Sequence, residues 1–400
     1  MRPTTGLRAI PASIWALGFV SMFMDISSEM VHSLLPVFMV STLGAGTFTV
    51  GVIEGIAEAT ASITKVFSGT VSDYLGKRKI LAVTGYGIAA VTKPLFPLAP
   101  SLAWVVTARF VDRVGKGIRG APRDALVADL APPHLRGACF GLRQSLDTAG
   151  AFAGPLLAVV LMLVTGDNFR AVFWVAVVPA FVALGILVFG VSEPERPPSH
   201  TTARVPMRFA DVIGLDPAYW VVVLIATVLT LARFSEAFLV LRALDAGLAA
   251  SYVPLVLVGM NMAYAASSYP LGVLSDRIER RHLLMVGCLV LVVSDLVFAH
   301  GTTVGHVMAA VLLWGLHMGM TQGIFAAMVT DTVPPHLRGT AFGIFNLAGG
   351  VAMLAASVLA GALWQRYGFA ATFNAGATLA VLTVIGLAIL RRNPRTERPE

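Results

Sequence analysis

Charged residues are scarce in this 400-residue chain. Only 13% of the residues are Asp, Glu, Lys or Arg, whereas 56% are hydrophobic. A water-soluble protein of this size needs more polar surface than that. The scarcity of charge therefore argues against a soluble globular protein. Because apolar runs of about 20 residues recur along the whole chain, the sequence predicts a polytopic, all-α membrane protein.

Cysteine is also nearly absent, and familiar catalytic motifs are missing. The two cysteines, Cys139 and Cys288, fall in separate apolar segments and predict neither a disulfide framework nor a metal site. The sequence contains no H-E-x-x-H zinc motif, no nucleophile elbow and no phosphate-binding loop. We therefore expect no enzymatic activity, no cofactor and no bound metal.

The net charge of +7 has a simple explanation in a membrane protein. Most of the Lys and Arg residues lie in the even-numbered loops and the tails, which the positive-inside rule places in the cytoplasm. We therefore expect a lipid bilayer rather than nucleic acid as partner, and an inner-membrane protein with both termini cytoplasmic. The first apolar stretch has no clear cleavage site, so we interpret it as an uncleaved span.

The hydrophobic pattern predicts twelve transmembrane helices. They are expected near residues 13–42, 48–71, 80–98, 102–128, 138–163, 170–191, 218–242, 251–273, 282–299, 305–329, 339–363 and 370–390. The segment 192–212 is polar and rich in proline, which is typical of a linker. We therefore predict an N-terminal six-helix bundle (1–191), a cytoplasmic linker (192–212) and a C-terminal six-helix bundle (213–400).

Two sequence echoes indicate that these halves are repeats. DLAPPHLRGACFG begins at Asp129, and DTVPPHLRGTAFG begins 202 positions later at Asp331. GTVSDYLGKRK from Gly69 returns 203 positions later as GVLSDRIERRH from Gly272. Two independent echoes at nearly one spacing predict parallel, pseudo-symmetric halves related by an axis along the membrane normal.

At these residues the chain resembles the major facilitator superfamily over essentially its full length. The run from Gly69 to Arg78 matches that family's signature between the second and third spans, although Glu279 replaces its second glycine in the C-terminal copy. The fifth span resembles the family's antiporter signature at Gly141, Gly150, Gly154 and Pro155, with Ala158-Val159 in place of its final Gly-Gly. The family also has an arginine in the fourth span, for which Arg109 fits the register and Arg113 is a rival. The resemblance implies a secondary transporter that works by alternating access, and we expect a functional monomer.

Charged residues inside the spans are candidates for function, because a charge at the bilayer centre costs about 2.5–3.5 kcal/mol on insertion scales. Burial favours a neutral carboxyl group and a neighbouring arginine favours an ionised one, so such groups can exchange protons. We predict that the proton-coupling residues are Asp25, Glu29, Glu58 and Arg109. The alternative is that the charges form static pairs, such as Glu54 with Lys93 or Arg143 with Asp147. For Lys65 and Asp295, near span ends, snorkelling alone is a sufficient explanation.

Two further sets of residues are predicted to be functional, one from their depth in the spans and one from their place in a motif. Residues with polar or aromatic groups at cavity depth are predicted to bind substrate: Glu54, Arg113, Arg143, Asp147, Arg233, Glu236, Asn261, Tyr264, Trp314, His317, Gln322 and Asn346. The motif residues are predicted to gate or shape the moving helices: Gly69, Asp73, Gly76, Lys77, Arg78, Arg136, Gly150, Gly154, Pro155, Asp276 and Arg338. A lone histidine such as His317 is more often simply hydrogen-bonded than functional.

The resemblance and these residues together predict a proton-coupled exporter of a small organic compound. The alternative is a proton-driven importer of an anionic organic solute, such as a siderophore or a carboxylate, since several arginines would attract an anion. A membrane receptor or an intramembrane enzyme is a third possibility. However, the loops and tails are too short for a sensing domain.

Overall fold

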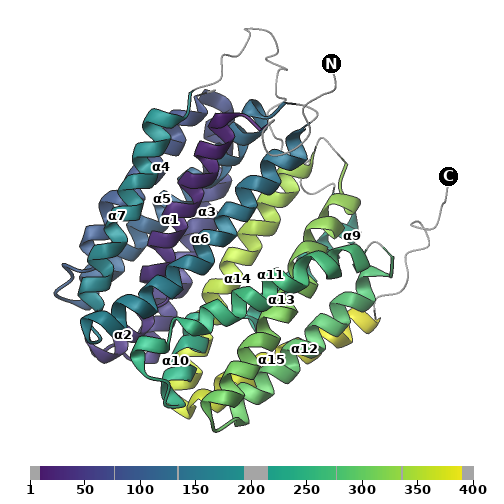
Figure 1. Cartoon of the computed structure of the whole chain (residues 1–400). Helices are drawn as coiled ribbons and strands as arrows, with labels where there is room; N and C mark the ends of the chain where they lie inside the picture. Colours follow the sequence, from purple (N-terminus) through teal and green to yellow (C-terminus); the bar gives the residue numbers. More distant parts are fainter. Residues whose placement is uncertain are drawn as a thin grey trace.

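The computed structural model describes residues 10–75, 77–132, 135–192, 215–275, 277–334 and 337–389; the side chains of residues 70, 73–75, 326 and 338–340 lie outside this description. Long helices run side by side and make up most of these residues, and the described part of the chain contains no strand (Figure 1). The helices fall into two groups that follow the order of the sequence, the first from purple to teal and the second from green to yellow (Figure 1).

Each predicted span corresponds to a helix or to a pair of helices. The N-terminal half contains α1 (Ala12–His32), α2 (Leu35–Ser41), α3 (Thr47–Leu75), α4 (Arg78–Thr92), η2 (Lys93–Leu95), α5 (Leu102–Leu130), α6 (Arg136–Thr165) and α7 (Phe169–Gly190). The C-terminal half contains α9 (Pro217–Ala232), α10 (Ala237–Asp245), η4 (Ala250–Tyr252), α11 (Leu255–Ser275), α12 (Arg280–His300), α13 (Val304–Thr332), α14 (Arg338–Tyr367) and α15 (Phe369–Ile389). The predicted linker lies almost entirely outside the described residues, so the boundaries of the two halves stay a prediction.

The ends of several helices follow directly from local sequence. Asn168 caps α7 by accepting a hydrogen bond from the N–H of Ala171, and Asp216 caps α9 by accepting one from the N–H of Ala218. Gly166 ends α6 in the left-handed conformation with φ of 63°, which glycine adopts at little cost. These polar and glycine residues thus mark the points where apolar helices give way to short connections.

The first and seventh spans are each divided into two helices, which the sequence analysis did not anticipate. In the first span, α1 ends at His32 and α2 begins at Leu35. Pro36 accounts for this break, since a proline ring lacks an N–H and clashes with the carbonyl four residues earlier, here that of His32. In the seventh span, residues 233–236 separate α9 from α10. There the Ser357 hydroxyl accepts a hydrogen bond from the N–H of Ser235, so a side chain replaces the helical partner.

The repeated sequence segments form equivalent ion pairs, one in each half. Arg78 lies at the start of α4 and pairs with Asp129 near the end of α5, with 2.7 Å between Nη1 and Oδ2. Arg280 and Asp331 occupy the equivalent positions in the second half and form the same pair. The internal repeat is therefore a repeat of contacts as well as of sequence.

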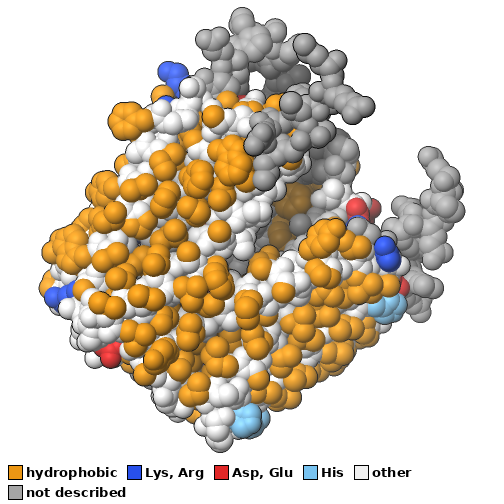
Figure 2. Space-filling model, viewed as in Figure 1, with side chains coloured by type: hydrophobic (Ala, Val, Ile, Leu, Met, Phe, Trp, Pro, Cys, Tyr) orange, Lys and Arg blue, Asp and Glu red, His pale blue; other side chains and the backbone are white. Residues whose placement is uncertain are grey.

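The two halves meet most closely at one end of the molecule. Every hydrogen bond that joins the halves within the described residues lies there: Thr47 to the Gly361 carbonyl, the Phe48 N–H to Gln365, and Ser251 to Asp167. The short helices α2 and α10 also pack against each other at this end. We call it the closed end. At the opposite end, where α1 begins and α15 ends, the surface is hollowed between the bundles, and we call this the open end (Figure 2).

Helices α3 and α14 form the main contact between the halves, and glycines bring their backbones together. A Cβ on Gly51 would lie 2.2 Å from the Ser357 carbonyl oxygen, and one on Gly361 would lie 2.6 Å from the Thr47 carbonyl oxygen. Nearer the open end, a Cβ on Gly350 would lie 2.8 Å from the Cβ of Ser62. Small residues at helix contacts are typical of membrane bundles, where close packing replaces the hydrophobic effect.

The outer surface is apolar, as a bilayer requires. Large apolar side chains cover the face shown in Figure 2, and charged side chains appear only near its ends. Among the described helices, eight are long and apolar enough to cross a membrane by length and composition. The others, α3, α4, α5 and α11, are shorter or more polar and complete the bundles. The structure confirms an all-α polytopic fold of twelve transmembrane helices in two pseudo-symmetric six-helix bundles.

Candidate functional site

A line of basic residues on α5 forms the centre of the candidate site. Arg109, Arg113, Lys116, Arg119 and Arg123 follow one another at intervals of three or four residues. This spacing places them along one face of a helix. The face is turned inward, because Arg109, Arg113 and Arg119 are all buried. The fourth span therefore brings five positive charges into the N-terminal bundle.

Two glutamates on α3 match the first two arginines. Glu54 Oε2 lies 2.7 Å from an Arg109 guanidinium nitrogen, and Glu58 Oε1 lies 3.2 Å from one of Arg113. Both residues of the first pair are buried, whereas the Glu58 side chain is 34% exposed. The four-residue spacing on each helix thus produces two successive ion pairs, one enclosed and one at the cavity surface.

The expected pair of Glu54 with Lys93 is wrong. Lys93 instead pairs with Asp112 on α5, with 2.9 Å between Nζ and Oδ1, and also donates a hydrogen bond to Ser28. Both Lys93 and Asp112 are buried. The reason is geometric: Lys93 lies on η2, beside α5, so a carboxylate of α5 is nearer than one of α3. Sequence position along each span does not reveal which neighbouring helix a side chain faces.

Helix α1 contributes His32 and Asp25 to the candidate site. His32 Nδ1 lies 2.7 Å from an Arg109 guanidinium nitrogen, so Arg109 contacts both α1 and α3. Asp25 lies near Asp147 of α6, so the negative charges of the two carboxylates repel each other.

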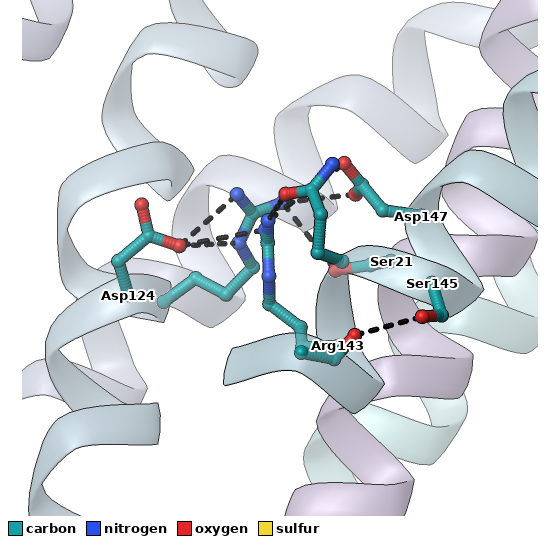
Figure 3. A network of polar contacts seen from close by, with 8 residues as sticks. Ser21, Asp124, Arg143, Ser145 and Asp147 are labelled. Carbon is teal, nitrogen blue, oxygen red and sulfur yellow. Dashed lines mark hydrogen bonds and ion pairs between the residues drawn. The ribbon is translucent and has the colours of Figure 1, made fainter. Parts of the chain in front are cut away.

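A second group of charges joins α5 to α6 nearer the open end. Arg143 of α6 lies between Asp124 and Asp147, at 3.5 and 3.8 Å, and donates a further bond to Gln144 (Figure 3). Arg123 contacts the same two aspartates and the Ser21 hydroxyl. The expected static contact of Arg143 with Asp147 is thus present, as one part of a larger network.

Within the described part of the chain, four charged side chains near the centre have neither an ion pair, a hydrogen bond nor a ring contact: Glu29, Lys116, Arg233 and Glu236. Arg119 also lacks an ion pair and a hydrogen bond, but its guanidinium lies 4.9 Å from the centre of the Tyr86 ring. The carboxylate of Glu29 interacts most strongly with Lys116 and then with Arg113. Across the interface, Glu236 interacts with Glu29 and Glu58 of the N-terminal half and with its neighbour Arg233. Charges from the two halves therefore face one another across a shared space. Arg233 and Glu236 do not form the direct pair that a helix would allow, because they lie in the break between α9 and α10.

A cavity of about 210 Å³ lies between the halves at this position. Its wall includes Glu58 and Ser62 of α3, Thr227 and Thr230 of α9, and Asn346 of α14, with Arg233 at the break. Acidic, basic, hydroxyl and amide groups are thus presented to one space, which suits a small polar organic molecule.

The remaining predicted binding residues are not part of this cavity wall. Trp314 is buried among Phe234 and Phe298 in the C-terminal bundle. His317 is also buried, and its Nδ1 is 2.8 Å from the Gly287 carbonyl oxygen. Tyr264 lines a separate hollow between α11 and α13. Asn261 and Gln322 are half-buried on the same two helices.

The predicted gating residues divide into two kinds. Gly150 and Gly154 of α6 contact α1 directly. A Cβ on Gly150 would lie 2.4 Å from the Met22 carbonyl oxygen, and one on Gly154 would lie 2.8 Å from the Ile26 carbonyl oxygen. A Cβ on Gly69, by contrast, would make an ordinary contact of 3.5 Å, so no tight approach is present there.

The other gating residues lie at helix ends or on α6. Pro155 is buried within α6, Arg136 is exposed at its first residue, and Lys77 is exposed before α4. Gly76, Asp276 and the side chains of Asp73 and Arg338 lie outside the described residues.

Sequence reasoning assigned no role to Lys116 or Asp112. The sequence does place both residues beside the predicted site: Lys116 lies seven residues after Arg109 on α5, and Asp112 lies one turn before Lys116. Their partners come from other helices, and only the structure shows that Asp112 is neutralised and Lys116 is not.

Comparison with known proteins places this architecture in a family. The sequence matches the Major Facilitator Superfamily over residues 17–258 and 234–400. It is 33% identical over 389 residues to an MFS-type transporter of Methanocaldococcus jannaschii, covering 96% of this chain and 95% of that one. It is 26% identical over 360 residues to the gentisate transporter of Corynebacterium glutamicum, covering 87% and 80% of the two chains.

A solved structure supports the same fold. A POT family transporter in complex with 5-aminolevulinic acid superposes with a TM-score of 0.81 at 13% identity, over 99% of both chains. The repeated halves, the interrupted first and seventh spans and these similarities lead to one conclusion: the chain belongs to the Major Facilitator Superfamily and is a membrane transporter rather than an enzyme.

Proposed function

We propose that this transporter couples the movement of protons to the movement of a small organic acid through the central cavity. The observation that carries the proposal is the set of four unpaired charges described above. Lys116 belongs to the N-terminal half and Arg233 to the C-terminal half, and neither has an ion-pair partner within the described residues. Arg233 lines the cavity, and Lys116 interacts with Glu58 of the opposite wall, so a carboxylate between the halves would be attracted by both cations.

The unpaired acids supply the coupling. When Glu29 and Glu236 are ionised, they offset Lys116 and Arg233, so an anion gains little on entering. When the two glutamates bind protons, the cations are left in excess and attract an anionic solute. Binding of proton and solute is then mutually favourable, which is the thermodynamic condition for coupled transport.

The Asp25–Asp147 contact adds a further place for a proton. The two carboxylates, on α1 and α6, repel each other when both are ionised, and one proton bound between them would relieve that repulsion. We assign the coupling role first to Asp25 and Glu29. Arg109 is already engaged by Glu54 and His32, which gives it a mainly structural role.

Uptake is the direction that this chemistry favours. A membrane potential that is negative inside opposes entry of an anion by about 2.3 kcal/mol per charge per 100 mV. A proton that enters with the anion removes this opposition, whereas export of an anion needs no such help. The open end would be cytoplasmic in the orientation that the positive-inside rule predicts, so this conformation faces the interior. The relative named as a gentisate transporter is consistent with an organic acid as cargo.

Export in exchange for protons is the second candidate. It is supported by the antiporter-like glycines of the fifth span, since Gly150 and Gly154 lie directly against the backbone of α1. In that case the carboxylates of α1 would exchange between proton and cargo, and the cargo would be neutral or cationic.

Proton flux in liposomes distinguishes these functions. The purified protein is reconstituted with a pH-sensitive dye inside, and gentisate is added outside as the probe at neutral pH. We expect gentisate-dependent acidification of the lumen that is lost in Glu29→Gln and strongly reduced in Lys116→Ala. Lys65→Ala, which removes an exposed lysine at the open end of α3, is the matched control and should retain activity.

The alternatives give different results in the same assay. Alkalinisation of the lumen would indicate exchange and support export. Gentisate movement without proton movement, unchanged in Glu29→Gln, would show a uniporter and reject the coupling role. If neither moves, a panel of neutral and cationic compounds tests whether the cargo is an organic acid at all.

A further inference from the structure

Asp295 is a buried carboxyl group in the C-terminal bundle that the central cavity does not use. It lies on α12 and is 0% exposed. Neither of its carboxylate oxygens has a hydrogen-bond partner within the described part of the chain. Snorkelling therefore does not explain it, which corrects the expectation from its position near a span end.

A second buried group without a partner points to the same place. The seventh span breaks after Ala232, so the helical N–H that would bond the Ala232 carbonyl is displaced. No backbone N–H of the described residues donates to this carbonyl, and Ala232 itself is 0% exposed. Buried polar groups of this kind are nearly always satisfied in folded proteins.

The two groups converge on Gly376 of α15. A Cβ at that position would lie 2.7 Å from Asp295 Oδ2 and 3.1 Å from the Ala232 carbonyl oxygen. The absence of a side chain on Gly376 is what lets both oxygens approach the same point. Each of them is an acceptor, and a proton on the carboxyl group would supply the donor that both lack.

Among the residues that the structure describes, no charged side chain pairs with Asp295. Arg233, the next residue after Ala232, interacts with Glu236 and Tyr264 instead. On α13, His317 is engaged with the Gly287 carbonyl. On α10, Arg242 bonds the carbonyls of Phe298 and Gly301 and pairs with Asp245. An ionised Asp295 would thus be a buried charge without a counter-ion, which proteins avoid by binding a proton.

We propose that Asp295 is a second proton-binding residue, whose neutral carboxyl group donates a hydrogen bond to the Ala232 carbonyl and holds the break in the seventh span. Loss of the proton leaves two acceptor oxygens facing each other, so the break must change shape. Arg233 and Glu236 lie in that break, and Arg233 lines the cavity. Protonation inside the C-terminal bundle is thereby linked to the position of two cavity charges. The bracing contact is independent of the cargo, whereas its effect on transport rests on the proposed function.

Infrared spectroscopy of the purified full-length protein tests the protonation directly. With ¹³C-labelled aspartate, we expect the carboxylic-acid carbonyl band of the wild type to lose the contribution of one carboxyl group in Asp295→Asn. If the two spectra agree in this region, Asp295 is ionised and the proposal is wrong. This measurement needs no transport activity, so its failure is distinct from failure of the proposed function.

Stability measurements test the bracing contact. Asp295→Asn keeps a neutral donor and should unfold near the wild-type temperature, whereas Asp295→Leu lacks the donor and should unfold at a lower one. Gly376→Ala should also be less stable, while Gly386→Ala on the same helix, where a Cβ meets no atom within 4 Å, should be unaffected. Equal stability of the Asn and Leu variants would overturn the contact. If sodium raises the melting temperature only when Asp295 is present, Asp295 binds a metal ion rather than a proton, and the proposal is wrong.

Discussion

The buried pair of Glu54 and Arg109 allows a quantitative prediction about stability. In Glu54→Gln the volume hardly changes, but Arg109 loses the carboxylate that neutralises it. The pair is enclosed, with side chains 0% and 3% exposed and 2.7 Å between the charged atoms. Removing one partner of such a pair costs about 3–5 kcal/mol, because the other charge stays buried. We therefore expect Glu54→Gln to lower the free energy of unfolding by about that amount.

Glu58→Gln is the matched control for this measurement. It makes the same chemical change one turn further along α3, against Arg113, but Glu58 is 34% exposed and the distance is 3.2 Å. Exposed pairs contribute only about 0–1 kcal/mol. The two single variants should consequently differ by at least about 2 kcal/mol, although each loses one carboxylate that faces an arginine of the same helix.

Unfolding of the purified protein by sodium dodecyl sulfate in mixed micelles, followed by circular dichroism, measures the difference. The double variant Glu54→Leu/Arg109→Met removes both charges and should be more stable than Glu54→Gln alone. Equal stability of the two glutamine variants would contradict this prediction. Loss of proton-linked transport in Glu54→Gln without loss of stability would also contradict it, since Glu54 would then be a coupling residue rather than a structural one.

Two further predictions concern the contact between the halves and the shared proton. Gly51→Ala should lower the melting temperature and the yield of folded protein, because its Cβ would lie 2.2 Å from the Ser357 carbonyl oxygen; Gly141→Ala, where no atom lies within 4 Å, should match the wild type in a thermal-shift assay. Asp147→Asn should remove the proton shared with Asp25 and reduce by one the number of protons that the purified protein releases on alkaline titration; an unchanged count would show that the two carboxyl groups hold no common proton.

Much of the architecture could be predicted from sequence because it depends on local and repeated patterns. The twelve spans follow from the length of apolar runs, and the repeat follows from the echoes at Asp129 and Asp331. Those echoes also contain the residues that form the equivalent ion pairs Arg78–Asp129 and Arg280–Asp331. Patterns of this kind are visible in one sequence because a helix in lipid must form all its backbone hydrogen bonds within itself, which requires a long apolar run.

The pairing of charges between helices could not be predicted in the same way. Glu54, Arg109, Asp112 and Lys93 were all visible as charges within spans, but their partners depend on the rotation and relative depth of three helices. Those quantities are set by the sum of many contacts and leave no pattern in one sequence. The break at Arg233 is similar, since its cause includes the hydroxyl of Ser357, more than a hundred residues away.

The divided first and seventh spans separate the closed end from the wall of the cavity. Helices α2 and α10 make the closure, whereas α1 and α9 carry or adjoin the charges of the cavity, and a short non-helical segment lies between the members of each pair. Short segments of this kind are where a backbone can absorb a change in dihedral angles, as at the hinges of moving domains. If these segments act as hinges, the open end can narrow around a cargo before α2 and α10 separate, which would give a form with both ends shut.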